Sequence, residues 1–122
     1  MKFIHSGVAE RFRVDASGNL LVGTTTTYPA GSGVSGAFIE SLGRIEASRA
    51  SAPAIRANRN TTDGDIMEFR KDGSTVGSIG VEGADLTIGN GDVGIGFVPD
   101  FDAIRPMNMS TNAIRDAAID LG

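Results

Sequence analysis

A regular recurrence of aliphatic residues constrains the fold of this chain more than any other feature of its sequence. From residue 45 onward an aliphatic side chain returns about every ten residues, the spacing that short strands separated by turns produce. The series is Ile45, Ile55, Ile66, Val76, Leu86, Ile95, Ile104 and Ile114. Turn-forming pairs stand between its members: Asp63-Gly64, Asp72-Gly73, Glu82-Gly83 and Asn90-Gly91. The pattern predicts an all-β chain of short strands, arranged as an array, a solenoid or a sandwich.

The N-terminal part shows a second strand pattern. Phe12 and Val14 alternate with charged neighbours, as a half-buried strand requires, and residues 16–19 supply turn chemistry before Leu20 resumes the apolar pattern. We therefore expect a β-hairpin segment in residues 1–27, a Gly/Ser/Pro-rich linker with a short apolar patch in residues 28–42, and a repetitive β shaft in residues 43–122. Residues 110–122 fit a short helix and a short strand equally well.

Glycine residues inside the expected strands point to an unusual packing arrangement. Gly80, Gly89, Gly94 and Gly96 alternate with or follow apolar residues. Glycine adds no buried surface to a strand unless another backbone approaches closely or the strand bends sharply. With 17 glycines the core of one chain would be thin, and association with further copies is one way to complete it. This favours a fibrous oligomer, although a tightly bent barrel would also use such glycines.

Several classes of active site are disfavoured by composition. The chain has no cysteine and a single histidine, His5, which argues against thiolate sites, histidine-rich metal sites and catalytic triads. A net charge of -4 argues against nucleic acid as a partner. No segment is apolar for long enough to predict a membrane span. The G-x-G-x-x-G pattern at residues 89–94 precedes an expected strand rather than a helix, so we interpret it as a turn and expect no cofactor.

Two groups of charged residues are candidates for contact with a ligand. Asp63, Asp65, Asp72, Asp85 and Asp92 lack the spacing of a calcium loop, and Asp100 with Asp102 is not enough to predict a glycosidase, so we expect neither a metal site nor an enzyme. The arginines Arg44, Arg49, Arg56 and Arg59 are interpreted as a solvated or inter-chain pairing surface. Contact with an anionic glycan is the weaker alternative for them.

Three segments resemble a known class of virion proteins. RFRVDASGNLLVGTTTT, residues 11–27, resembles a signature that recurs in bacteriophage tail-fibre and tailspike proteins. Residues 66–96 resemble the β-helical or triangular shaft of such proteins. Residues 105–122 are similar to the segment that leads into an endosialidase-type intramolecular chaperone domain, whose self-cleaving residues have no counterpart here. The resemblance implies three parallel chains around a common axis, contact with other virion tail proteins, and a role at host-surface polysaccharide.

We therefore expect an elongated, intertwined trimeric fibre of β-helix or β-prism type, with a β-hairpin near its N-terminus. Its function would be structural: a segment of a bacteriophage tail fibre or other virion appendage that supports host attachment as a homotrimer. The alternatives are a glycan-binding module or depolymerase fragment of a tailspike, and a bacterial adhesin or monomeric β-solenoid. The expected trimer core comprises Phe12, Val14, Ile45, Ile55, Ile66, Ile79, Ile88 and Ile95.

Overall fold

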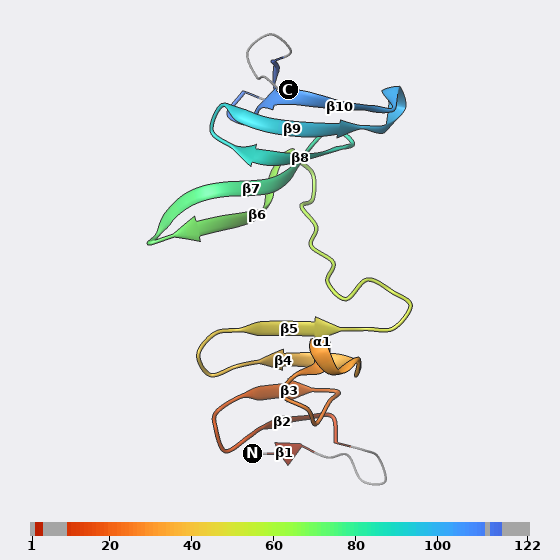
Figure 1. Ribbon diagram of the computed structural model, residues 1–122, viewed down its shortest axis with the longest axis vertical. Helices are drawn as coiled ribbons and strands as arrows, with labels where there is room; N and C mark the ends of the chain where they lie inside the picture. The colour runs from red at the N-terminus through yellow and green to blue at the C-terminus, as the bar shows by residue number, and fades with distance from the viewer. Residues whose placement is uncertain (1, 4–9, 112, 116–122) are drawn as a thin grey trace. The chain divides into compact units, whose positions relative to one another are not determined.

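The computed structural model describes residues 2–3, 10–111 and 113–115 (Figure 1). The chain is 49% strand and 7% helix, in two antiparallel sheets, which confirms the all-β class. It divides into two compact units, Met1–Arg56 and Ala57–Gly122. Each unit contains one of the sheets.

The first unit is a five-stranded sheet in which each strand pairs with the next one along the chain. Its strands are β1 (Lys2–Phe3), β2 (Phe12–Val14), β3 (Leu20–Val22), β4 (Gly36–Ile39) and β5 (Ile45–Ser48). The expected hairpin is present as β2 and β3, with Phe12 opposite Val22 and Val14 opposite Leu20. A short helix, α1 (Pro29–Ser32), connects β3 to β4.

Residues 28–42, expected as a linker, lie within the first unit and carry both α1 and β4. The proline and glycine residues of this segment shape a helix instead of loosening the chain. Pro29 occupies the first turn, where its missing N–H costs nothing, and Gly33 ends the helix at φ 70° in the left-handed region. Phe38 lies in β4 and packs into the core of the first unit, where it is 1% exposed. The boundary between the units follows Arg56.

The second unit is a six-stranded antiparallel meander, again with each strand beside the next in sequence. Its strands are β6 (Gly64–Lys71), β7 (Ser74–Glu82), β8 (Asp85–Asn90), β9 (Val93–Val98), β10 (Ala103–Asn108) and β11 (Ala113–Ile114), with a 3-10 turn, η1 (Pro99–Phe101), before β10. The β6–β7 turn has Asp72 at φ 49° and Gly73 at φ 82°. Two successive positive φ values are what a tight hairpin turn requires, so the Asp-Gly pair determines the register here.

The ten-residue recurrence corresponds to one strand and one turn. Its members lie in successive strands, from Ile45 in β5 to Ile114 in β11, except Ile55, which lies outside the strands. In the segment whose conformation the sequence left open, residues 113–114 form β11; residues 112 and 116–122 lie outside the described part of the chain.

Candidate interface surfaces

One face of the first sheet is entirely apolar. Side chains of directly paired residues lie on the same face of a sheet, and neighbours along a strand alternate between faces. By this rule β2 to β5 place on one side the residues Phe12, Val14, Leu20, Val22, Ala37, Ile39, Ile45 and Ala47. We call this set the first apolar face. Val14, Val22, Ile39 and Ile45 are exposed, from 42% at Val14 to 69% at Ile45, whereas Phe12 and Leu20 are half-buried.

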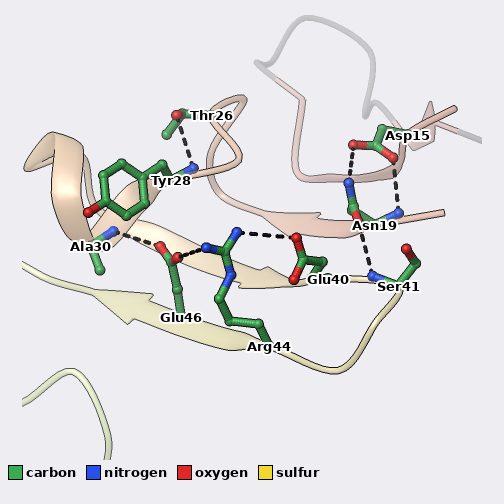
Figure 2. Close-up of polar contacts among 9 residues, drawn as sticks. All are labelled: Asp15, Asn19, Thr26, Tyr28, Ala30, Glu40, Ser41, Arg44 and Glu46. Carbon is green, nitrogen blue, oxygen red and sulfur yellow. Dashed lines mark hydrogen bonds and ion pairs between the residues drawn. The ribbon is translucent and has the colours of Figure 1, made fainter. Parts of the chain in front are cut away.

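The opposite face of the same sheet is closed by its own chain. Leu21 and Phe38 are paired across β3 and β4 and are each 1% exposed. The helix α1 is held over this side because the Ala30 backbone N–H donates to Glu46 Oε2 at 3.2 Å. Arg44 lies between Glu40 and Glu46, with its nitrogens 3.4 Å from a carboxylate oxygen of each (Figure 2). Its guanidinium also lies over the Phe38 ring, 5.4 Å from the ring centre. This face therefore needs no partner.

A polar network fixes the turns at one end of the first sheet. Asp15 accepts hydrogen bonds from the backbone N–H of Ser17 at 2.9 Å and from the backbone and side-chain nitrogens of Asn19 at 3.0 and 2.9 Å. Asn19 Oδ1 in turn accepts from the Ser41 N–H at 2.9 Å, which joins the β2–β3 turn to the β4–β5 turn (Figure 2). The bonds from Asn19, more than any other contact, lower the pKa of the Asp15 carboxyl, since they favour its charged form. The sequence indicated a turn at residues 16–19 but gave no sign of the link to Ser41.

The second sheet also has one largely apolar face, which is broader than the first. Pairing from β6 to β10 places on this side the residues Met67, Phe69, Ile79, Val81, Leu86, Ile88, Val93, Ile95, Phe97, Ile104 and Pro106. We call this set the second apolar face. Val93 and Ile104 are 56% and 60% exposed, and an open groove lined by Phe69, Ile79 and Ile88 crosses it. The same pairing also places the polar Asn90 on this side and, at the end of β6, the charged Lys71.

The other side of the second sheet is lined by glycine and polar residues. A β-carbon added at Gly94 would lie 2.4 Å from Met109 Sδ, and one added at Gly96 would lie 3.1 Å from Met107 Cγ. At Gly80 the obstacle would be the Gly64 carbonyl oxygen at 2.6 Å. The in-strand glycines thus make room for side chains and backbone of the same chain. The sequence had indicated close approach of another backbone or a bend, and among the described residues these intrachain contacts account for them.

The residues expected to form a trimer core fall mostly on the two apolar faces. Phe12, Val14 and Ile45 belong to the first, and Ile79, Ile88 and Ile95 belong to the second. Ile66 stands at a break in the β6–β7 register, and Ile55 is 67% exposed outside the strands. Sequence reasoning missed other members of these faces, among them Leu20, Val22, Ile39, Leu86 and Phe97. The alternation of residues within each expected strand would have identified them.

Two of the four arginines considered for glycan contact form ion pairs or hydrogen bonds within their own units. Arg44 is paired with two carboxylates as described above. Arg59 donates to the carbonyl oxygens of Thr62 and Asp65 at 2.9 and 3.1 Å and so fastens the segment that leads into β6. Arg49 and Arg56 are exposed. A glycan contact at these residues stays a prediction.

The G-x-G-x-x-G pattern at residues 89–94 forms the hairpin between β8 and β9. Gly89 and Gly94 lie in β8 and β9, and Gly91 between them turns the hairpin at φ 60°, with a strand and no helix following. Within the described part of the chain, no three His, Cys, Asp or Glu side chains are grouped so as to hold a metal ion. None of the helices described there is long and apolar enough to cross a membrane.

Comparison with models of protein families, with curated proteins and with solved structures found no match to this chain.

Proposed function

We propose that this chain is a structural segment of a bacteriophage tail fibre or another virion appendage, and that it acts as a homotrimer. The observation that carries the proposal is that each of its two sheets leaves a largely apolar face open to solvent. Large contiguous apolar patches on a protein surface mark sites of association.

The energetics favour covering these faces. Burial of apolar surface contributes roughly 25 cal/mol per Å², so full burial of a Val, Leu, Ile or Phe side chain contributes about 1.5–3 kcal/mol. Ile45, Val93 and Ile104 each keep more than half of their surface in water in the single chain. Because both faces carry many such residues, the free energy available from association is large compared with the marginal stability of a small domain.

The topology supports a three-sided arrangement. Each sheet is a simple meander of antiparallel strands, so each chain can supply both of its sheets without threading strands between those of its partners. Three such sheets around an axis would point their apolar faces inward and bury Phe12, Val14, Ile45, Ile79, Ile88 and Ile95 between chains. The resemblance of residues 11–27 to phage fibre proteins supports the same number of chains and a place in the virion, next to other tail proteins and near host-surface polysaccharide.

Substitutions on the apolar faces test the assembly. We expect Ile45→Asp and Ile88→Asp to convert the trimer to monomers, because each puts a carboxylate into a surface that would be desolvated between chains. Ile45 is 69% exposed in the single chain, so its change removes little packing from the first unit, whereas Ile88, at 38%, also loses part of its packing within the second unit. Thr75→Asp is the control, since Thr75 is exposed and paired with Arg70 on the opposite face of the second sheet. Sedimentation that showed unchanged mass for both face variants would contradict the proposal.

The place of the chain in a virion needs its own experiment. An antibody raised against the chain should label tail appendages of particles in electron micrographs. Labelling confined to a bacterial cell surface would instead support the adhesin alternative. A glycan array probed with the wild-type chain and with Arg49→Ala would separate a carbohydrate-binding role from a purely structural one.

A further inference from the structure

A small pocket opens on the glycine-lined side of the second sheet. Its volume is about 190 Å³, below the roughly 300–1,000 Å³ of pockets that hold drug-sized ligands, so any occupant is a small molecule. Charged, hydroxyl and apolar side chains line it together, among them Glu82, Asp85, Thr87, Arg105, Val98 and Met107.

The register of β7 to β10 brings the polar residues of this pocket together. Glu82 lies directly opposite Asp85 across β7 and β8. Thr87 in β8 and Arg105 in β10 both pair with Gly96, which lies between them in β9. Neighbouring strands are about 4.8 Å apart, so the backbones of Thr87 and Arg105 are separated by about 10 Å. A β-carbon added at Gly96 would lie 3.9 Å from Thr87 Cγ2, so the missing side chain of this glycine keeps the gap open.

The polar groups around the pocket lack partners within the chain. Thr87 is 4% exposed, yet its hydroxyl forms no hydrogen bond with any residue that the structure describes. Glu82 and Asp85 are half-buried and form no ion pair with a described residue. Arg105 is also half-buried; it lies 4.7 Å from the centre of the Phe101 ring but contacts no carboxylate in the described part of the chain. Burial of such groups costs free energy unless they are hydrogen-bonded, so an outside partner would be stabilised here.

We infer that this pocket binds a small zwitterion of the α-amino-acid class. An ammonium group has three N–H donors, which matches the three acceptors that Glu82, Asp85 and Thr87 provide. A carboxylate accepts two parallel hydrogen bonds from a guanidinium, which Arg105 supplies from the other side of Gly96. The two charges of the ligand thus bridge two groups of opposite charge that do not reach each other.

The lining of the pocket disfavours other small ligands. An anion without an ammonium group would face two carboxylates, and a cation without a carboxylate would leave Arg105 unpaired. Val98 and Met107, at 9% and 7% exposure, form an apolar wall with Ile114, which suits an aliphatic side chain better than a neutral sugar. L-valine is therefore a suitable probe.

This inference goes beyond the proposed structural role and does not rest on it. The pocket lies on the side of the second sheet opposite to the second apolar face, since Thr87 and Gly96 alternate along their strands with Ile88 and Ile95. Association through the apolar face therefore leaves the pocket accessible.

Titration of the isotope-labelled full chain with L-valine, followed by NMR, tests the inference. The amide signals of Thr87, Gly96 and Arg105 should shift and reach saturation. Isobutylamine and isovalerate, which each keep one of the two charges of valine, should bind at least about tenfold more weakly, because each leaves charged groups of the pocket unpaired. The inference is overturned if L-valine shifts no signal, if the shifted signals lie outside the pocket, or if glucose or either single-charge analogue binds as tightly.

Substitutions in the pocket provide a second measurement. Glu82→Gln and Arg105→Gln should each weaken L-valine binding by about 10- to 100-fold, because each removes a charge-assisted hydrogen bond. Thr87→Val keeps the shape of the side chain and should weaken binding by about 2- to 10-fold. Asp63→Asn is the control, since Asp63 is exposed outside the pocket, and it should bind like the wild type. Unchanged binding in both charge variants would overturn the inference, and the wild-type titration decides it alone if a variant does not fold.

Discussion

At the scale of single residues, Asn19 connects the two turns of the first unit. Its side chain donates to Asp15 and accepts from the Ser41 N–H, and it is 8% exposed. Asn19→Ala leaves the Ser41 donor without this acceptor, so we expect the free energy of unfolding of the first unit to fall by about 1–3 kcal/mol. Ser17→Ala is the control, because Ser17 contributes only its backbone N–H. Equal urea midpoints for the two variants would contradict the role assigned to Asn19.

Asp15 should make the first unit sensitive to acid. Its pKa is lowered in the folded chain, so its contribution to stability is fully present above the ordinary aspartate pKa of about 3.9 and is lost as the pH falls through the folded value. We expect the thermal midpoint of the wild type to fall more steeply below about pH 4 than that of Asp15→Asn. Asp63→Asn, which makes the same change in net charge, should follow the wild type. Parallel curves for wild type and Asp15→Asn would contradict this explanation.

Leu21 and Leu42 form a matched pair for testing the core of the first unit. Leu21 is 1% exposed and Leu42 is 92% exposed. Leu21→Ala should lower the free energy of unfolding by about 2–5 kcal/mol, because it removes buried surface and leaves a cavity. Leu42→Ala should change it by less than about 0.5 kcal/mol. Similar losses in the two variants would show that the described core does not stabilise this unit.

At the scale of elements, the β8–β9 hairpin depends on glycine to different degrees at different positions. A β-carbon at Gly89 would lie 2.4 Å from the Val93 carbonyl oxygen, which is backbone, whereas at Gly96 the nearest atom is Met107 Cγ at 3.1 Å. A methionine side chain can move and a paired backbone cannot. We expect Gly89→Ala to destabilise the second unit by about 1–3 kcal/mol and Gly96→Ala by clearly less, measured by urea unfolding at one fixed protein concentration. The reverse order would contradict the crowding described here.

The sequence predicted the strands and the tight turns between them better than the longer connection in residues 28–42. The Asp-Gly, Glu-Gly and Asn-Gly pairs determine their turns locally, so the β6 to β9 meander could be anticipated from residue types alone. The segment 28–42 was expected to be a linker because its glycines and serines resemble one, whereas its structure depends on the distant contacts of Phe38 with Leu21 and Glu46. Local composition does not reveal such contacts.

The sequence predicted that apolar residues form the candidate interface, but not which residues belong to each face. The ten-residue series selects one apolar residue for each strand from β5 onward, which is enough to find Ile45 and Ile95. Whether a face is wholly apolar depends on the register between strands, and the breaks in the β6–β7 pairing could not be read from the sequence. The contacts of the in-strand glycines likewise depend on where Met107 and Met109 lie.

At the scale of the whole molecule, the proposed homotrimer would cover the apolar face that each of the two sheets leaves open. On this proposal both units gain buried apolar surface from further copies. Stability should therefore depend on protein concentration, since anything that binds only the folded state shifts the folding equilibrium toward it.

The mass of the full chain in solution tests this account most directly. Native mass spectrometry at micromolar concentration should show a species of three chains, and this species should be lost in Ile45→Asp and kept in Thr75→Asp. A folded monomer with both sheets protected from hydrogen exchange would contradict the account, because the apolar faces would then be stable in water without a partner.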